Sequence, residues 1–121
     1  MEINRLSDRL RDQTRKHYGL EEELWVQFVQ DHKLYLRENS PYKSFTTLDL
    51  FQYKYRPEEF YKANRGDITQ TWIFLFVNDI RDASGFNESI SHLWVVDPDV
   101  ISKLRKQFES SAQHQALVAA S

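Results

Sequence analysis

The chain contains no cysteine and has only three glycines and three prolines among its 121 residues. Without cysteine it can form no disulfide, thiol nucleophile or cysteine-based zinc or iron–sulfur site, and three glycines leave no Gly-rich phosphate loop. Neither sign of charge dominates, because 16 basic side chains face 18 acidic ones for a formal net charge of −2. This balance argues against a nucleic-acid-binding domain.

Long hydrophobic runs are missing too. The longest, from Trp72 to Val77, is far shorter than the roughly twenty residues of a helix that crosses a bilayer. The N-terminal segment alternates charged and apolar residues and lacks the apolar stretch of a signal peptide. We therefore expect a protein that is made in the cytoplasm and contacts no membrane.

The patterns of common catalytic and metal sites are also absent. No histidine has a second one three or four residues away, the spacing of a helical metal pair, and no serine lies in a Gly-x-Ser-x-Gly turn; the histidines are His17, His32, His92 and His114. Glu58 and Glu59 are neighbours on an expected helix, so their side chains point about 100° apart and do not face each other. We predict no enzymatic activity, metal or cofactor.

Aromatic residues, in contrast, are abundant, with eight Phe, six Tyr and three Trp. This is enough large apolar surface for a modest hydrophobic core, to which we assign Trp72 and Phe76. Tyrosine has an amphipathic ring that suits a protein interface. Tyr53, Tyr55 and Tyr61 are therefore candidate interface residues.

Both ends of the chain show helical patterns. We predict helix over 1–38, interrupted at Gly19, with the wider apolar face on the second part, 20–38. Asp97, followed by Pro98 and another aspartate, has the composition of a helix start. The last residues, 112–121, are mostly Ala, Gln and Ser, and we expect them to fray.

Two strands are expected between these ends. The residues over 45–55 are rich in Phe, Thr and Tyr, which predicts a strand. A second, shorter strand is predicted at 92–96, before Asp97.

Two helices are expected between the strands. Pro57, followed by two glutamates, predicts the start of the first, which Gly66 ends. Asp67 and Gln70 resemble a capping box for the second, which continues to Asn78 or Asp79. The apolar run 73–77 is also compatible with a buried strand, although the cap favours helix.

These elements predict an α+β fold with three parts. A β-α-α-β core covers 41–97, a helical extension precedes it over 1–40, and a helix and tail follow over 98–121.

The segment 56–82 resembles a known family. It carries an Arg-Pro-Glu-Glu helix start, a Gly-Asp turn, a tryptophan in an apolar helix and an Asn-Asp end, formed by Arg56, Pro57, Glu58, Glu59, Gly66, Asp67, Trp72, Asn78 and Asp79. This arrangement is similar to the central motif of the LysM-like baseplate wedge proteins of T-even-type contractile-tailed bacteriophages. Where that family usually has Tyr before the glycine, this chain has Arg65.

The resemblance implies a LysM-like core and a structural role in the virion. It implies a wedge subunit of the tail baseplate, present in six copies, that binds neighbouring wedge and hub proteins and helps join wedges around the tail hub. The motif residues would then build the fold, with Trp72 and Leu75 at the seam between helix and sheet and Asn78-Asp79 at the exit of the chain. The alternative function is a LysM-type module that binds peptidoglycan or chitin.

Overall fold

The computed structural model describes residues 19–120, which divide into two compact units. One unit is continuous, from His32 to Leu104. The other combines residues 19–31 with residues from 105 onward. Each unit is described separately below.

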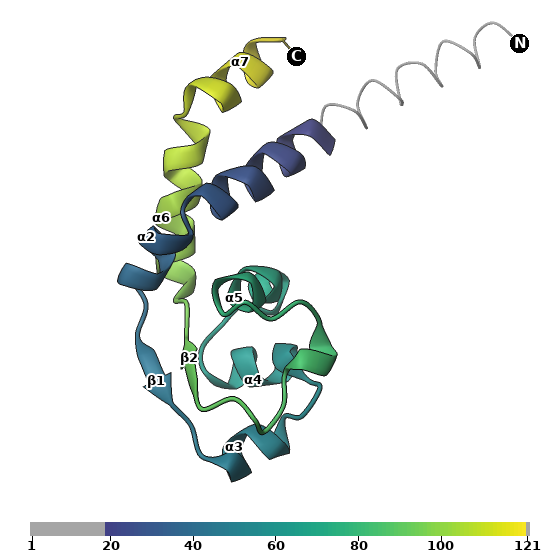
Figure 1. Ribbon diagram of the computed structural model, residues 1–121. Coiled ribbons are helices and arrows are strands. Elements are labelled where there is room, and N and C mark those ends of the chain that lie inside the picture. The colour runs from purple at the N-terminus through teal and green to yellow at the C-terminus, as the bar shows by residue number, and fades with distance from the viewer. Residues whose placement is uncertain (1–18, 121) are drawn as a thin grey trace, which may run out of the picture. The chain divides into compact units, whose positions relative to one another are not determined.

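The continuous unit contains a small antiparallel sheet of two strands, β1 (Tyr42–Ser44) and β2 (His92–Trp94). Tyr42 lies opposite Trp94 and Lys43 lies opposite Leu93. The predicted strand at 92–96 is confirmed at 92–94. Five further elements of this unit lie between the strands, and Figure 1 shows α4 and α5 grouped to one side of them; they are α3 (Thr47–Gln52), α4 (Pro57–Ala63), the 3₁₀ turn η1 (Ile68–Gln70), α5 (Thr71–Val77) and the 3₁₀ turn η2 (Ala83–Gly85).

The strand predicted at 45–55 is wrong, because most of that segment is the helix α3. Thr46 accepts a hydrogen bond from the backbone of Asp49, whose carboxylate accepts one from the Thr46 backbone. This capping box satisfies the first N–H groups of the helix. Leu50 is its buried residue, so the local cap together with one core contact overrides the β propensity of the surrounding residues.

The two helices predicted next are confirmed, and the strand alternative at 73–77 is excluded by α5. Pro57 is the first residue of α4, and two glutamates occupy its first turn. The capping box at Asp67 forms only in part. Asp67 accepts from Thr69 N at 2.9 Å to cap η1, whereas the Gln70 side-chain oxygen is buried without a hydrogen bond.

α4 and α5 end in the same way. The residue after each C-cap has a positive φ, 70° at Arg65 and 58° at Asp79. Gly66 N donates to Tyr61 O at 2.7 Å, and Ile80 N donates to Leu75 O at 2.9 Å. Both are Schellman motifs, so Arg65 rather than Gly66 makes the left-handed turn after α4.

Each of the helices α3, α4 and α5 contributes at least one buried residue to the core of this unit, and so does β2. Aromatic rings dominate it; its members are Leu50, Phe60, Tyr61, Phe74, Phe86 and Leu93. The Tyr61 and Phe74 rings stack with centroids 4.8 Å apart. This stacking joins α4 to α5.

Two more helices begin in the continuous unit, α2 (Lys33–Glu38) and α6 (Pro98–Glu109). The helix predicted over 20–38 is interrupted, because residues 19–31 and α2 are separated by a turn at His32. The predicted start of α6 is confirmed, since Asp97 accepts from Asp99 N at 2.8 Å.

The other unit contains the helix over 19–31, the last turn of α6 and α7 (Ala112–Ala120). Phe108 packs between Trp25 and Phe28, with ring centroids 5.5 and 5.4 Å away. Arg105 pairs with Glu21 at 2.6 Å. The tail expected to fray is helical over 112–120, and His114 in it is buried.

Gly19 is itself helical, and the predicted helix before it lies outside the described residues. The fold is thus mixed helix and sheet, in agreement with the α+β class. Along residues 19–120, no helix combines the length and apolar character that a bilayer crossing requires. The boundaries 1–40, 41–97 and 98–121 stay a prediction.

Candidate functional site

The first motif residues build the start of α4. The Arg56 guanidinium pairs with Glu59 at 2.6 Å and also donates to the Gln52 carbonyl. Pro57 is buried, whereas Glu58 is exposed in the first turn. Carboxylates there face the positive end of the helix, which makes this a structural arrangement.

Gly66 and Tyr61 form a close contact that requires glycine. A Cβ at Gly66 would overlap the ring of Tyr61, whose hydroxyl donates to Val96 O at 2.5 Å. Burial, and to a smaller extent Asp97 and Asp67, raises the pKa of Tyr61. Tyr61 is fully buried, so its assignment to an interface is wrong: the ring joins α4 to the core instead.

The expected position of Trp72 at a buried seam is wrong, because Trp72 is 37% exposed. Ile73, Phe74 and Val77 are the apolar residues of α5 that turn inward. In the helical repeat Trp72 lies on the opposite side of α5 from these positions. Phe76, four residues later, shares its outer face and is only half-buried, which also corrects its assignment to the core.

Asn78 has a role that the sequence did not reveal. Its side-chain oxygen accepts from Trp94 N at 2.7 Å, and its nitrogen donates to Trp94 O at 2.9 Å. The same nitrogen donates to Phe74 O at 2.8 Å. The amide group therefore pairs with β2 as another strand would, and ties the end of α5 to the sheet.

Asp79 follows in the left-handed conformation and forms two ion pairs. One carboxylate oxygen pairs with Lys33 and the other with Arg37, the latter at 2.8 Å. The hydrogen bond from Lys33, followed by the one from Arg37, lowers the pKa of Asp79. Arg37 also donates to Val77 O at 2.7 Å and packs on the Trp94 ring, so α2 is bound to the end of α5.

The motif residues therefore do not converge on a catalytic centre. Apart from Trp72, which is exposed on α5, they start a helix, end a helix or join two elements. The described residues hold no group of three or more metal-ligating side chains. Asp67 and Asp82 each cap a 3₁₀ turn. The hydrogen bond from Thr69 lowers the pKa of Asp67, and the one from Ser84 lowers the pKa of Asp82.

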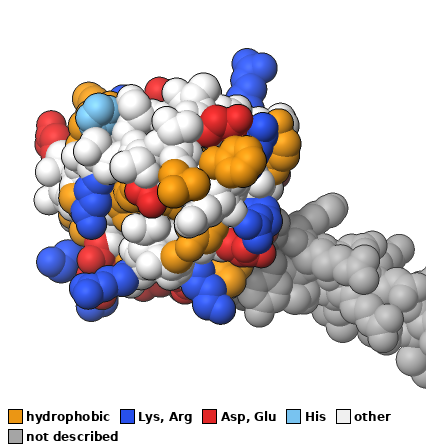
Figure 2. All heavy atoms as spheres, turned by 90° about the horizontal axis from the view of Figure 1, so that it is seen from below, with side chains coloured by type: hydrophobic (Ala, Val, Ile, Leu, Met, Phe, Trp, Pro, Cys, Tyr) orange, Lys and Arg blue, Asp and Glu red, His pale blue; other side chains and the backbone are white. Residues whose placement is uncertain are grey.

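A group of exposed large apolar side chains lies on α3 and the turn after it. We name it the α3 patch; its members are Leu48, Phe51, Lys54 and Tyr55. Leu48 is 66% exposed, Phe51 54% and Tyr55 53%. The Lys54 ammonium lies 5.9 Å from the Phe51 ring centroid and 5.2 Å from that of Tyr55, so it lies near both rings. Figure 2 shows hydrophobic side chains between charged ones on this face.

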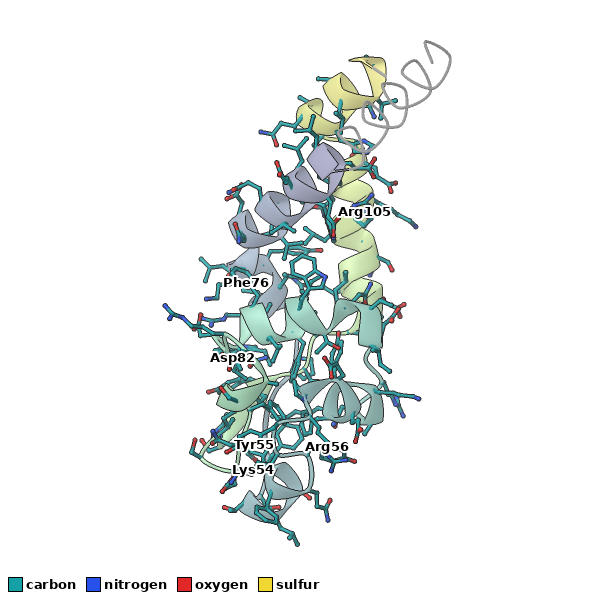
Figure 3. All side chains as sticks on the ribbon, turned by 90° about the vertical axis from the view of Figure 1, so that its right-hand side faces the viewer. Lys54, Tyr55, Arg56, Phe76, Asp82 and Arg105 are labelled. Atoms are coloured by element: carbon teal, nitrogen blue, oxygen red, sulfur yellow. The ribbon has the colours of Figure 1, made fainter. Side chains whose placement is uncertain are left out.

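The backbone of Tyr55 is strained. Its φ is 62°, which costs an L-residue with a large side chain roughly 1–2 kcal/mol. The hydrogen bond from Tyr55 N to Phe86 O, 2.8 Å, holds the conformation. Figure 3 shows Lys54 and Tyr55 at the α3 end of the unit, apart from Phe76. Tyr53, in contrast, is half-buried against Phe60, so only Tyr55 of the three candidate tyrosines is largely exposed.

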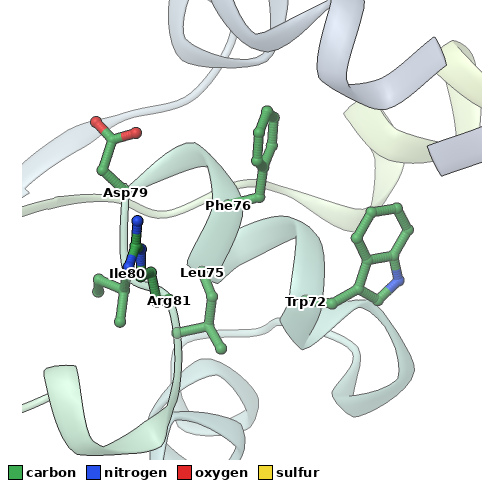
Figure 4. Close-up of a pocket in the computed structure, with 6 residues that line it drawn as sticks. All are labelled: Trp72, Leu75, Phe76, Asp79, Ile80 and Arg81. Atoms are coloured by element: carbon green, nitrogen blue, oxygen red, sulfur yellow. The ribbon is translucent and has the colours of Figure 1, made fainter. Parts of the chain in front are cut away.

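A second surface feature lies along the outer face of α5. It is an open hollow of about 480 Å³, which we name the α5 hollow; it is lined by Trp72, Leu75, Phe76, Asp79, Ile80 and Arg81. Figure 4 shows the Trp72 and Phe76 rings projecting from successive turns of α5, with Ile80 and Arg81 in the segment that follows.

Some of these features had a signal in the sequence. Thr46 and Asp49 have the spacing of a capping box, which identifies α3 and hence the outer positions of Leu48 and Phe51. No local signal indicates that Lys33 and Arg37 reach Asp79, because those pairs join residues more than forty positions apart.

Comparisons with known proteins find no match to this chain among protein-family models, curated proteins or solved structures.

Proposed function

We propose that this chain is a structural subunit of a bacteriophage tail baseplate, a wedge component that binds neighbouring wedge and hub proteins. The observation that carries the proposal is the α3 patch. Three large apolar side chains, each more than half exposed, lie within eight residues of one another. Contiguous exposed apolar patches often mark sites where a protein binds another protein.

The composition of the patch favours a protein partner. Tyrosine and phenylalanine are enriched in the centres of protein interfaces, where they bury large areas with few rotatable bonds. The Lys54 charge is already paired with Glu88 at 3.1 Å. The patch can therefore be covered without leaving an unpaired buried charge.

The strained backbone of Tyr55 points in the same direction. Left-handed φ values of large residues concentrate at functional sites. In this conformation the Tyr55 ring lies near the Lys54 ammonium at the surface. With a negative φ at residue 55, the chain after α3 would leave in a different direction.

The order of elements supports a LysM-like core, which is part of the proposal. Two antiparallel strands enclose the segment that contains α4 and α5. The Arg56 to Asp79 motif supplies the ends of those helices. In this proposal six copies act in the virion, around the tail hub, and the chain has no enzymatic activity.

Cryo-electron microscopy of contractile tails, purified from cells that express the chain, tests the proposal. We expect density for the chain in the baseplate, with the α3 patch against another subunit. Leu48→Gln should leave the fold intact but reduce incorporation into tails. Leu34→Gln is the matched control, because Leu34 is 71% exposed on α2 and lies outside the patch.

Equal incorporation of both variants would contradict the assignment of the interface to α3. Tails that lack the chain, combined with saturable binding of the purified protein to insoluble peptidoglycan or to chitin oligomers, would favour the alternative, a LysM-type glycan-binding module.

A further inference from the structure

The α5 hollow offers an apolar surface of suitable size for one or two large side chains. Trp72 and Phe76 are one helical turn apart on the outer face of α5, and Leu75 lies beside them. Ile80 extends this surface beyond the end of the helix. Hollows of a few hundred Å³ with aromatic walls are typical of binding sites for small apolar groups.

The charges around the α5 hollow are mainly positive. Asp79 is its one acidic wall residue, and both of its oxygens already pair with Lys33 and Arg37. The Lys33 ammonium also lies 5.0 Å from the Phe76 ring centroid. With Arg81 and its neighbour Asp82 included, three cations thus lie near two carboxylates.

Arg81 is the cation of this group that is available to a ligand. No hydrogen bond or ion pair joins its guanidinium to another described residue, although its charge contributes to the lowered pKa of Asp82. Its neighbour Asp82 accepts hydrogen bonds from Ser84 N at 3.0 Å and Gly85 N at 3.3 Å, so that carboxylate is occupied by the turn. An exposed guanidinium such as that of Arg81 can bind a carboxylate with two parallel hydrogen bonds.

We propose that the α5 hollow binds a segment of a partner protein in which an aspartate or glutamate adjoins a large apolar side chain. The apolar side chain packs on Trp72 and Phe76, and the carboxylate pairs with Arg81. Lys33 and Arg37 share the single negative charge of Asp79. The net positive charge of this group favours an acidic segment over a basic one. This inference does not rest on the baseplate assignment or on the α3 patch, so either can fail alone.

The experiment uses the full chain and two synthetic peptides. One is a capped peptide of alternating glutamate and leucine, and in its matched control glutamine replaces each glutamate. Fluorescence anisotropy measures the affinity of the labelled peptides. NMR of the indole N–H groups, assigned with Trp72→Phe, locates the site.

We expect the glutamate peptide to bind about tenfold more tightly than the glutamine peptide, since its charged hydrogen bond to Arg81 is absent from the control. The Trp72 signal should shift on binding. Arg81→Gln should remove most of the difference between the peptides. Lys62→Gln should not, because Lys62 is an exposed cation on α4 outside the hollow.

Three results would each overturn the proposal: no saturable binding of the glutamate peptide, equal affinity for both peptides, or an unchanged affinity in Arg81→Gln. Thermal denaturation of each variant shows that it is folded. Sedimentation velocity measures whether the chain associates with itself. Self-association that Arg81→Gln abolishes would also overturn the proposal, because the hollow would then bind a second copy of the chain.

Discussion

The Asn78 side chain pairs with both main-chain polar groups of Trp94, at 2.7 and 2.9 Å, and so connects the end of α5 to strand β2. Asn64 occupies the equivalent C-cap position of α4 and makes the same local bond, from its side-chain nitrogen to Phe60 O at 2.8 Å. It has no bond to a strand among the described hydrogen bonds. The two asparagines thus separate a local capping role from a tertiary one.

Asn78→Ala should lower the free energy of unfolding by about 2 kcal/mol, because it leaves the half-buried N–H and C=O of Trp94 without partners. Asn64→Ala, the control, loses only the local bond and should cost about 1 kcal/mol or less. Urea denaturation of the two variants measures the difference. Equal losses would show that the pairing with Trp94 contributes nothing beyond the cap.

Gly66→Ala should destabilise the continuous unit by about 1–3 kcal/mol, the usual range for an overpacked core. Its new Cβ would overlap the Tyr61 ring, and that ring is held by the stacking on Phe74 and the hydrogen bond to Val96. Thermal unfolding followed by near-UV circular dichroism reports both stability and ring packing. Gly85→Ala is the control, with a smaller expected loss, since its Cβ meets only Ile80 at 3.3 Å; a neutral Gly66→Ala would mean that Tyr61 can move.

At Tyr55, glycine should be more stable than alanine by about 1 kcal/mol, because both substitutions delete the ring but only alanine keeps the cost of the left-handed backbone. Comparison of Tyr55→Gly with Tyr55→Ala by chemical denaturation therefore isolates the strain. If alanine proved equal or better, the positive φ would be absent in solution.

The ion pairs of Asp79 should make stability depend on acid pH. Lys33 and Arg37 lower the pKa of this carboxyl in the folded state, so its contribution is present above the unfolded value of about 3.9 and is lost as the pH falls through the folded pKa. In Asp79→Asn that contribution is gone at every pH. The stability gap between wild type and variant should consequently narrow as the pH falls from 6 to 3, as urea denaturation across that range would measure.

A gap that stays constant over this range would contradict the role given to the Asp79 charge. A constant offset between the curves is expected in addition, because asparagine adopts the left-handed conformation of residue 79 more readily than most residues. The pH dependence, rather than the absolute stability, is therefore the test.

The sequence alone determined those elements whose signals lie within a few residues. The starts of α4 and α6 follow from a proline at the first helical position and acidic residues beside it. The capping residue Asp67 and the short strand at 92–94 are local features of the same kind. Such signals act between neighbouring atoms of the chain, so they can be interpreted without knowledge of the fold.

Only the tertiary structure decided what each element contacts. The β-forming residues over 45–55 became α3, because the Thr46 cap and the burial of Leu50 outweighed their propensity. Trp72 turned outward, since the helical phase of α5 is set by the neighbours of Ile73, Phe74 and Val77. The pairing of Asn78 with Trp94 and the ion pairs of Asp79 join residues that are distant in the chain. The α5 hollow exists because the orientation of α5 turns Trp72 and Phe76 outward. Burial and long-range pairing depend on which surfaces meet, and that is a property of the folded chain rather than of any local stretch of it.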